Sequence, residues 1–572
     1  MKLIFKYLRP HARAVVFGLT VKVIATLFEL LLPYILSHIL DVVVPRHELT
    51  DILVWGGAML AAAFLAMLGN IIANRNASRV ARDASRAIRH DLFDATMHLS
   101  SRNIDRLTVP SLESRLTSDT YHVHHFMNTM QRMAVRAPIM LFGGIAITLV
   151  LDWRLSLVMI AILPFIGISV YFITRRGLPL YTETQKAVDV MVRVVREDCQ
   201  GVRVIKALSK EAHESRRYDE ANRRLISREQ KAGVNMALSN PLMTLILNLG
   251  LAAVILTGAY LVNGGLSLPG RIIAFIQYFT LMSNAMTVIT RIFVQTTKAS
   301  ASASRIAEVV YAADNSRNTG EDKRDEDGES FIVFDDVCFS YNGKRDNLSH
   351  VSFSLPRGAT LGVIGATGSG KTTLVSLLQR FYDIDSGSIR IGGEDIYTID
   401  ATRLHEMFGV VMQSDFIYAD TVAENIRFGR DVSDAAIRRA ATLAQAADFI
   451  EGFADGYDHM LTAKGTNVSG GQRQRILISR ALAAEPQILI LDDASSALDY
   501  KTDAALRRAI REGMHTTTVV VAQRVSSVKH ADLILVLDHA EVIGAGTHEE
   551  LMVSCPAYKE ISDSQMGGAF LE

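Results

Sequence analysis

Residues 361–372 read Leu361-Gly362-Val363-Ile364-Gly365-Ala366-Thr367-Gly368-Ser369-Gly370-Lys371-Thr372. The first four are apolar, as in a buried strand, and the last eight fit the spacing G-x-x-x-x-G-K-[ST]. The helical pattern Leu374-Val375-Ser376-Leu377-Leu378 follows at once. A strand, a glycine-rich loop and a helix therefore occur in the order of a phosphate-binding loop. Backbone N–H groups and the helix N-terminus can then surround phosphate oxygens.

This loop predicts a nucleotide site. We expect Lys371 to reach the β- and γ-phosphates of ATP, and the Thr372 hydroxyl to ligate Mg²⁺. A glycine-rich turn can fit the same spacing by chance, but the flanking strand and helix argue against that. The predicted nucleotide-contacting residues of the loop are Gly365, Ala366, Thr367, Gly368, Ser369, Gly370, Lys371, Thr372 and Thr373.

The composition of the whole chain indicates a membrane part. Its 572 residues are 49% hydrophobic, with a mean hydropathy of +0.19, which is too apolar for an ordinary soluble protein. The 60 acidic and 60 basic residues balance, so nothing predicts nucleic acid as a partner. Cys199, Cys338 and Cys555 match no metal-binding spacing, and we expect reduced structural thiols.

Apolar runs long enough to cross a bilayer as helices occur about six times. They fall at residues 15–44, 53–73, 134–151, 155–174, 241–262 and 272–294. The segments between the second and third runs, and between the fourth and fifth, are long, polar and basic. The excess of Lys and Arg places these segments and both termini in the cytoplasm. We expect helical hairpins there, with tips near Val109-Pro110-Ser111 and Gln200-Gly201-Val202.

These patterns predict a protein of two kinds of domain. An all-α polytopic membrane domain of six helices, with long cytoplasmic extensions, occupies residues 1–313. Residues 314–330 are highly charged and nearly free of large apolar groups, so we expect a linker. Residues 331–572 alternate β-rich runs with helical patterns, which predicts an α/β domain with a parallel sheet.

Three further motifs follow the phosphate loop in a fixed order. The first is Thr466-Asn467-Val468-Ser469-Gly470-Gly471-Gln472-Arg473-Gln474-Arg475, where a Ser, two Gly and a helix start form a second anion-binding end. The second is the apolar run Ile488-Leu489-Ile490-Leu491, which ends in Asp492-Asp493. The third is Val519-Val520-Val521-Ala522-Gln523-Arg524. With the membrane runs, this set resembles an ABC half-transporter of the multidrug-exporter type.

The resemblance implies roles for further residues. Tyr341 matches the aromatic residue that stacks on adenine, and Gln413 the glutamine that senses Mg²⁺ and contacts the membrane domain. Asp492 matches the Mg²⁺-associated carboxylate, so the implied metal set is Thr372, Gln413 and Asp492. Asp499 matches the loop that links two ATP sites. The segment that closes over ATP bound to the other subunit is Val468, Ser469, Gly470, Gly471 and Gln472.

The resemblance also implies architecture. One six-helix membrane domain is fused to one P-loop ATPase domain that carries a helical subdomain. Residues 103–120 and 197–211 resemble the cytoplasmic loops that dock on the ATPase domain. The implied cofactors are ATP and Mg²⁺. The implied location is a bacterial cell membrane with the ATPase domain in the cytoplasm.

Three positions depart from the family pattern. Asp493 stands where a catalytic Glu is usual, and Ala463 replaces a Glu common in exporters. Gln523 replaces the switch His, which in the family donates to the γ-phosphate. We predict that this chain binds ATP well and cleaves it poorly, beside a partner half-transporter with intact Glu and His. A slow homodimeric exporter is an alternative, and an ATP-gated regulatory or channel-like protein is another.

Charged residues inside the apolar runs are candidates for the substrate pathway. Lys22 and Glu29 share one face of the first run, and Pro33 is expected to kink it. Ionisable groups at this depth usually face a bundle interior or cavity, although an internal ion pair or snorkelling near the cytoplasmic end explains them equally well. Arg136 and Arg291 lie nearer the helix ends, where snorkelling to the interface is expected. The family implies an amphipathic drug, lipid or peptide as the transported molecule.

Overall fold

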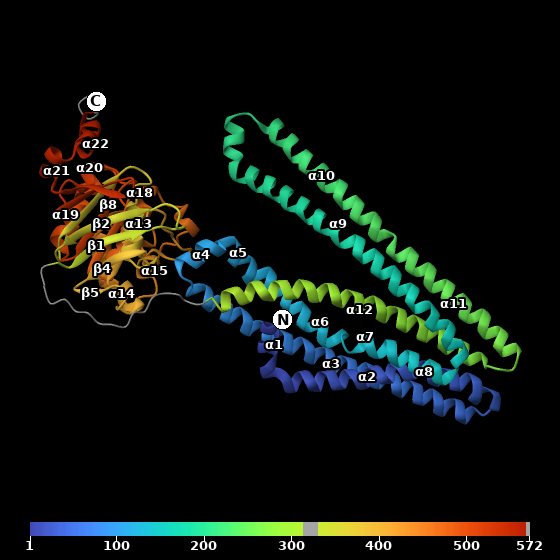
Figure 1. Ribbon diagram of the computed structural model, residues 1–572. Coiled ribbons are helices and arrows are strands. Elements are labelled where there is room, and N and C mark those ends of the chain that lie inside the picture. Colours follow the sequence, from blue (N-terminus) through green and yellow to red (C-terminus); the bar gives the residue numbers. More distant parts are fainter. Residues whose placement is uncertain (313–329, 568–572) are drawn as a thin grey trace. The chain divides into compact units, whose positions relative to one another are not determined.

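The computed structural model describes residues 1–312 and 330–567, which fall into two compact units (Figure 1). Unit 1 consists of Met1–Leu99 and Leu107–Ala312. Unit 2 consists of Ser100–Arg106 and the described part of Ala313–Glu572. Apart from Ser330, the expected linker at 314–330 lies outside the described residues, so the predicted domain boundaries stay predictions.

Unit 1 is built from long helices joined by short turns (Figure 1). Its α-helices are α1 (Lys2–Leu8), α2 (Ala12–His38), α3 (Leu49–Met97), α5 (Val109–Ser114), α6 (Thr120–Met133), α7 (Arg136–Pro138), α8 (Gly144–Leu151), α9 (Trp153–Ala207), α10 (Glu211–Ala237), α11 (Ser239–Asn263) and α12 (Pro269–Val310). Short π- and 3₁₀-helical turns continue several of them: η1 (Arg9–His11), η2 (Ile39–Val43), η3 (Val44–Arg46), η4 (Arg115–Asp119) and η5 (Ile139–Gly143).

Five apolar helical stretches of the described chain are long enough to cross a membrane. They are Lys2–Arg46, Leu49–Met97, Val109–Leu151, Thr244–Asn263 and Pro269–Val310. Each coincides with one of the expected runs. The remaining run, at 155–174, falls on α9, where the apolar stretch Trp153–Ser169 is shorter. Five spans are therefore identified, and the sixth stays a prediction.

Small residues let the first two long helices pack closely. A Cβ added at Gly69 of α3 would lie 2.8 Å from the Cβ of Ala25 on α2. Ala66 and Ala73 of the same α3 face are also buried. In a membrane, where lipid offers no hydrophobic drive between helices, such close packing is what holds helices together.

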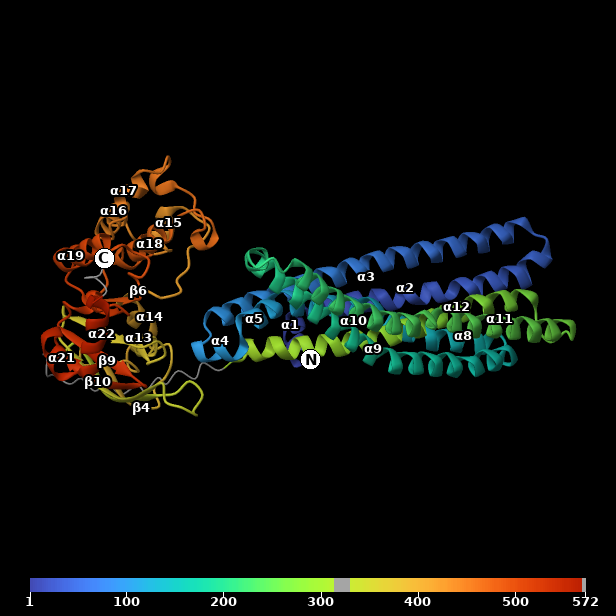
Figure 2. The same ribbon diagram turned by 90° about the horizontal axis from the view of Figure 1, so that it is seen from above.

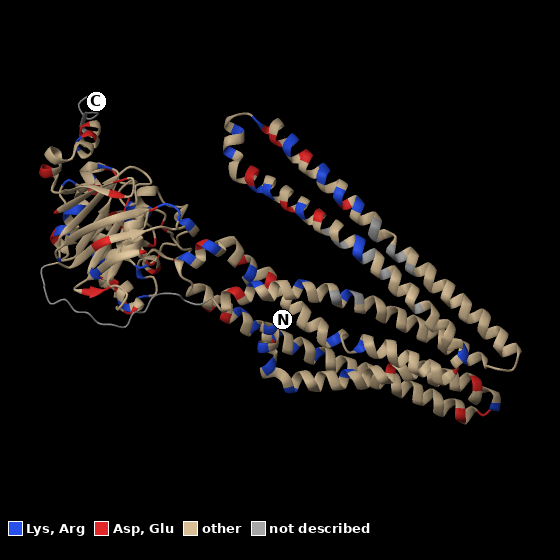
Figure 3. Ribbon diagram, viewed as in Figure 1, with Lys and Arg blue, Asp and Glu red and all other residues tan. Residues whose placement is uncertain are grey.

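Charged residues gather toward the turn between α9 and α10, as the colours of the ribbon show (Figure 3). The tip expected at Gln200-Gly201-Val202 is wrong, because α9 continues through it to Ala207. A single glycine lowers helix stability by only about 1 kcal/mol, which neighbouring helix formers can offset. The turn comes at Leu208–Lys210 instead, where Ser209 adopts a φ of 50°. At the other expected tip the chain turns at Thr108, just before α5.

Unit 2 contains two sheets. One has the order β2-β1-β4-β5 with antiparallel neighbours, and the other has the order β10-β9-β3-β8-β7-β6 with a parallel centre. The strands are β1 (Ile332–Phe339), β2 (Leu348–Leu355), β3 (Thr360–Gly365), β4 (Ser386–Ile391), β5 (Glu394–Asp395), β6 (Phe408–Val411), β7 (Ile488–Asp492), β8 (Thr517–Val521), β9 (Leu533–Asp538) and β10 (Glu541–Gly546). The predicted parallel α/β sheet is confirmed.

Four helices of unit 2 form a separate group. Helices α15 to α18 gather on one side of the strands, as Figure 2 shows, and share an apolar core that includes Ile437, Ile450 and Ile476. This group is the expected helical subdomain. The α-helices are α4 (Ser101–Leu107), α13 (Lys371–Leu378), α14 (Ala401–Glu406), α15 (Val422–Arg427), α16 (Asp434–Leu443), α17 (Ala447–Glu451), α18 (Gly470–Leu482), α19 (Tyr500–Gly513), α20 (Val525–Val528), α21 (His548–Ser554) and α22 (Pro556–Gly567).

The short segment Ser100–Arg106 packs with unit 2 although it comes from the first hundred or so residues. The Tyr382 hydroxyl donates a hydrogen bond of 2.6 Å to Asp105 Oδ2. Burial, followed by this bond to a carboxylate, raises the pKa of Tyr382. Asp105 belongs to the region 103–120 that was expected to dock on the ATPase domain, and this contact supports that expectation.

Candidate nucleotide site

The glycine-rich loop connects β3 to α13 in a conformation that needs its glycines. At Gly370 φ is 106°, and a Cβ there would lie 2.6 Å from the carbonyl oxygen of Asn347. At Gly365 a Cβ would collide with the carbonyl oxygen of Leu537. Any larger residue at these positions would push the loop off the sheet. The loop therefore holds its N–H groups at the start of α13.

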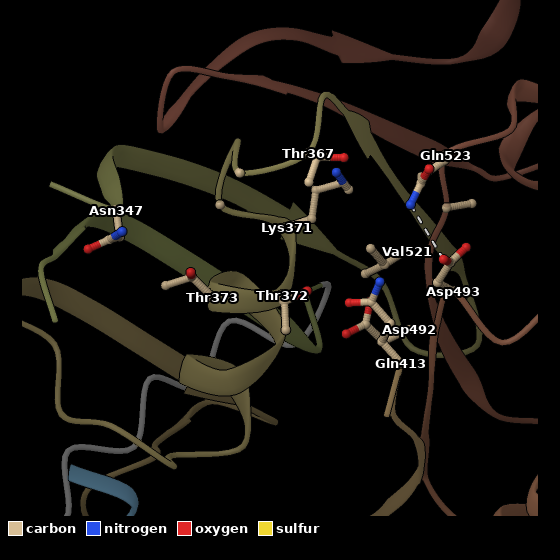
Figure 4. A pocket seen from close by; sticks show the side chains of 13 residues that line it. Asn347, Thr367, Lys371, Thr372, Thr373, Gln413, Asp492, Asp493, Val521 and Gln523 are labelled. Carbon is tan, nitrogen blue, oxygen red and sulfur yellow. Dashed lines mark hydrogen bonds between the residues drawn. The ribbon is translucent and has the colours of Figure 1, made fainter. Parts of the chain in front are cut away.

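A cavity of about 210 Å³ lies at the carboxyl ends of the parallel strands (Figure 4). The phosphate loop, the end of β7 and the residues after β6 and β8 all contribute to its wall. The lining residues are Asn347, Thr367, Gly368, Gly370, Lys371, Thr372, Thr373, Gln413, Asp492, Asp493, Val521, Ala522 and Gln523. Residues predicted separately from three motifs, together with Gln413, thus share one cavity, at the edge where α/β sheets bind ligands.

Lys371 carries the positive charge of this cavity. Its ammonium group donates hydrogen bonds to the carbonyl oxygens of Gly365, at 2.9 Å, and Ala366, at 2.8 Å. Burial lowers the pKa of Lys371, and the nearby carboxylates of Asp492 and Asp493 oppose that shift. The lysine therefore stands at the loop, where it can bind phosphate oxygens.

Asp492 places an unpaired carboxylate oxygen inside the cavity. Its side chain is 2% exposed, and among the described residues no group hydrogen-bonds its Oδ2. Burial raises the pKa of Asp492, while a hydrogen bond from Thr372 opposes the rise. A buried carboxylate without a partner is costly unless a cation completes it. Together with Thr372 and Gln413, it forms the oxygen-rich set that Mg²⁺ prefers.

The two residues that depart from the family pattern contact each other. The Gln523 side-chain amide donates a 3.4 Å hydrogen bond to Asp493 Oδ2 (Figure 4). Asp493 adopts a φ of 53°, a left-handed conformation that Asp tolerates better than most residues. Its own N–H donates to the Val521 carbonyl at 2.9 Å. Burial raises the pKa of Asp493, whereas Lys371 and Arg524 lower it.

Tyr341 lies beside the loop but outside the residues that line the cavity. Its hydroxyl donates a 3.4 Å hydrogen bond to Thr373, and its ring is 40% exposed. Tyr382 meets this ring edge-on at a centroid distance of 5.0 Å. The exposed part of the ring leaves room for a stacked base. Asn347 lines the cavity although the sequence analysis did not single it out, because no motif marks it.

The predicted segment that contacts ATP of the other subunit, residues 468–472, lies elsewhere in unit 2, at the start of α18. Ser469 and Gln472 form a reciprocal cap: the Gln472 N–H donates to Ser469 Oγ at 3.2 Å, and the Ser469 N–H donates to Gln472 Oε1 at 2.9 Å. Val468, Gly470 and Gly471 complete the segment. None of these residues lines the 210 Å³ cavity, and their expected action on a second subunit stays a prediction.

Asp499 also lies outside the cavity lining and begins a helix. Its carboxylate accepts hydrogen bonds from the Thr502 N–H at 2.9 Å and the Thr502 hydroxyl at 2.8 Å. These bonds lower the pKa of Asp499, with the backbone bond as the largest cause. The carboxylate is therefore ionised and fixed at the N-terminus of α19.

Lys22 and Glu29 belong to a polar network in unit 1. Lys22 Nζ donates to Asn70 Oδ1 at 2.5 Å and to Asn74 Oδ1 at 3.3 Å. Asn70 donates to Glu29 Oε1 at 2.7 Å, and Arg136 pairs with Glu29 Oε2 at 2.9 Å. The pair between Arg136 and Glu29 was not predicted, and the snorkelling expected of Arg136 stays a prediction. The two asparagines were missed, since nothing in the sequence of α3 links them to α2.

The comparisons with known proteins agree with these features. The family described as "ABC transporter transmembrane region" matches residues 15–286, and "ABC transporter" matches residues 348–496. The ABC transporter ATP-binding protein YfiB of Bacillus subtilis is 32% identical over 569 residues, covering 99% of each chain. This chain belongs to the ABC transporter family. An ABC transporter of this layout fuses its membrane region and its ATP-binding domain in one polypeptide.

Two further relatives of this ABC transporter have more specific names. The ATP-dependent lipid A-core flippase of Vibrio cholerae is 30% identical over 574 residues, covering 99% of this chain and 98% of that one. A solved bacterial Atm1-family ABC exporter with ATP bound superposes with a TM-score of 0.81 and 25% identity, covering 97% and 98% of the chains. The ABC transporter described here therefore has the exporter fold. It is an integral membrane half-transporter, and exporters of this class work as dimers.

Proposed function

We propose that this ABC exporter subunit binds ATP tightly and cleaves it slowly, as the degenerate half of a heterodimer. The observation that carries the proposal is the contact between Gln523 and Asp493 in the wall of the cavity. These two residues replace the His and Glu on which hydrolysis depends in the family. Six of the nine predicted loop residues line the same cavity, namely Thr367, Gly368, Gly370, Lys371, Thr372 and Thr373, as do Gln413 and Asp492 of the predicted metal set.

ATP binding rests on the loop and its surroundings. Lys371 and the loop N–H groups would hold the phosphates, and the exposed Tyr341 ring would stack on the base. Thr372, Gln413 and Asp492 would hold Mg²⁺, which neutralises charge on the phosphates. The unpaired Asp492 oxygen supports this assignment, because it needs a cation or a donor.

Slow cleavage follows from the size and chemistry of the two replacements. Asp493 is one methylene shorter than Glu, so its carboxylate stands back from the water that a Glu would activate. A displacement of about 1 Å can cost about 10²-fold in rate. Gln523 can donate a hydrogen bond but cannot take up a proton, so it stabilises developing charge less well than a histidine.

The partner would supply the missing chemistry. In this arrangement the segment Val468–Ser469–Gly470–Gly471–Gln472 completes a hydrolytic site whose Glu and His belong to the partner. The helix start capped by Ser469 provides N–H donors and a positive dipole end for that purpose. Ala463, where exporters usually carry a Glu, removes one charge from the nearby loop and alters cross-talk between the halves.

The transported molecule is proposed to be amphipathic: a drug, a lipid or a peptide. The relative named a lipid A-core flippase favours a lipid. Lys22 and Glu29, with Arg136, would contribute polar groups to the pathway, and Glu29 and Arg136 keep side-chain exposures of 20% and 45%. We place the protein in the bacterial cytoplasmic membrane, with the ATPase domain in the cytoplasm.

One experiment tests the asymmetry. The chain is co-expressed with a candidate partner half-transporter from the same organism that carries the intact Glu and His, and ATP turnover of the purified pair is measured. Changing the catalytic Glu of that partner to Gln should abolish turnover, whereas Asp493→Asn in this chain should change it modestly. Equal losses from the two changes would contradict the degenerate-site scheme. Brisk turnover by the chain alone would instead indicate an ordinary homodimer, and ATP-dependent passive conductance would indicate a channel-like protein.

A further inference from the structure

The last described helix, α22, reaches the segment that carries Gln523. The Gln565 side chain donates a 2.9 Å hydrogen bond from Nε2 to the carbonyl oxygen of Gln523. The same side chain accepts a 2.8 Å hydrogen bond from the Val525 N–H through Oε1. Both ends of one carboxamide therefore bind the main chain on the two sides of Arg524.

The contact between Gln565 and the backbone requires a carboxamide side chain. A carboxamide offers a donor and an acceptor side by side, which suits a carbonyl oxygen and an N–H two residues apart. Val525 is the first residue of α20, so its N–H has no hydrogen-bond partner within that helix. The Gln565 side chain supplies the acceptor that this backbone donor needs. A lysine, aspartate or apolar residue could satisfy only one of these groups or neither.

Helix α22 is fixed firmly enough to impose a position. Tyr558 is fully buried, and it shares an apolar cluster with Ala522 and Val525. The Tyr558 hydroxyl lies 2.8 Å from His548 Nδ1, which ties α22 to α21. Gln565 follows Tyr558 by about two turns of the same helix. The carboxamide is thus held by a packed element rather than by a free chain end.

The backbone segment that Gln565 binds, residues 523–525, adjoins the cavity. Ala522 and Gln523 line the 210 Å³ cavity, and the Gln523 side chain bonds to Asp493. We propose that Gln565 is a positioning residue: it fixes the Gln523 backbone so that the Gln523 amide faces the γ-phosphate end of the site. Helix α22 thereby takes part in distinguishing ATP from ADP at this site. This inference rests on the proposed nucleotide binding at this cavity.

The test compares ATP with ADP at this chain's own site. The full-length protein, in its purified transporter assembly, is photolabelled with 8-azido-ATP, and MgATP or MgADP competes. Labelling is counted on this chain only. Gln565→Ala should raise the MgATP concentration needed for half-competition about 5-fold, the order expected for losing hydrogen bonds. The MgADP concentration should change less than about 2-fold, because ADP has no γ-phosphate for Gln523 to contact.

Two variants separate positioning from general support. Gln565→Glu keeps the acceptor for the Val525 N–H but sets a carboxylate against the Gln523 carbonyl, so it should show the same ATP-selective loss. Ser564→Ala, an exposed neighbour on α22, should behave as the wild type. In a Gln523→Ala background, Gln565→Ala should have no further effect on the ATP-to-ADP ratio, because coupled residues are not additive.

Different results would overturn the positioning role of Gln565 and the proposed nucleotide binding. Equal weakening of MgATP and MgADP, or an undiminished effect in the Gln523→Ala background, would overturn the positioning role. Loss of the ATPase domain's thermal unfolding transition in both Gln565 variants would also overturn it, since Gln565 would then only maintain the fold. If the wild-type chain itself is not labelled, the proposed nucleotide binding fails first. If it is labelled and the Gln565 variants match it, only this inference fails.

Discussion

Gln523 and Asp493, the two residues that replace a His and a Glu, are hydrogen-bonded to each other, with the Gln523 Nε2 donor 3.4 Å from Asp493 Oδ2. The two departures are therefore one structural unit. The amide of Gln523 occupies an oxygen that a catalytic carboxylate would need for water. The short carboxylate and the neutral switch residue fit each other, so restoring one alone leaves the other mismatched.

Restoring both residues should restore hydrolysis at this site. We expect Asp493→Glu with Gln523→His to raise ATP cleavage by about 10²-fold, the lower limit for a working general base. The measurement is phosphate release from the proposed heterodimer, purified with a partner that carries Gln in place of its catalytic Glu, so that only this site can turn over. The matched control is Asp493→Gln with Gln523→His, which has the length of Glu without its basicity. Activity in that control equal to the restored variant would refute the argument.

Binding, unlike cleavage, should depend on Lys371. Lys371→Met removes the ammonium group that stands at the loop carbonyls, and charged hydrogen bonds contribute about 1.5–3 kcal/mol each. We expect MgATP affinity to fall on the order of 10–100-fold, measured by calorimetry on the purified full-length protein. Lys344→Met, at an exposed lysine of the same unit, should leave affinity unchanged. Unaltered binding in Lys371→Met would place the phosphates elsewhere.

The raised pKa of Asp492 predicts a pH dependence of metal binding. Only the ionised carboxylate suits Mg²⁺, and burial moves its pKa above the ordinary 3.8. As pH falls through that raised pKa, Mg²⁺-dependent ATP affinity should fall, at a higher pH than an exposed aspartate would give. Titrations of MgATP affinity against pH test this. The Asp492→Asn variant should bind MgATP weakly at every pH, and its affinity should no longer change with pH in this range.

The raised pKa of Asp492 also predicts how the stability of the nucleotide-free protein depends on pH, and here stability falls as pH rises. The folded state holds the Asp492 proton more tightly than the unfolded state, so this stabilising contribution is complete below pH 3.8 and is lost as pH rises through the folded pKa. At neutral pH the buried carboxylate therefore costs stability. Asp492→Asn should raise the melting temperature of the nucleotide-free protein there, as scanning calorimetry would show. A lower melting temperature would mean that the hydrogen bond from Thr372 outweighs the cost of burying the carboxylate.

The sequence was informative wherever function depends on contiguous residues. The phosphate loop from Gly365 to Thr373 could be predicted because glycine spacing and one lysine carry the chemistry together. Asn347 could not, because a strand pairing brings it to the cavity. Gln565 was missed for the same reason, since its partners at Gln523 and Val525 are reached only after α22 folds back.

The membrane half shows the same limit. Hydropathy located the apolar runs because each span is a local feature. It gave no information about which polar groups meet between helices, so Arg136 was assigned to the interface although it pairs with Glu29. The expected hairpin tip at Gln200-Gly201-Val202 failed because helix formers on both sides outweighed one glycine.

The network around Glu29 provides the last prediction. Glu29 accepts hydrogen bonds from Asn70 at 2.7 Å and from Arg136 at 2.9 and 3.1 Å, so Glu29→Ala removes the acceptor that these two side chains share at membrane depth. Hydrogen bonds between membrane helices contribute about 0.6 kcal/mol on average, so we expect a loss of about 1 kcal/mol in stability. Thermal unfolding of the protein in lipid nanodiscs measures it, with Glu48→Ala at an exposed site as the control. Glu29→Gln, which keeps an acceptor but not the charge, should recover the Asn70 bond and weaken the Arg136 pair. If Glu29→Ala leaves stability unchanged while ATP turnover loses its response to amphipathic compounds, Glu29 serves the transport pathway rather than helix packing.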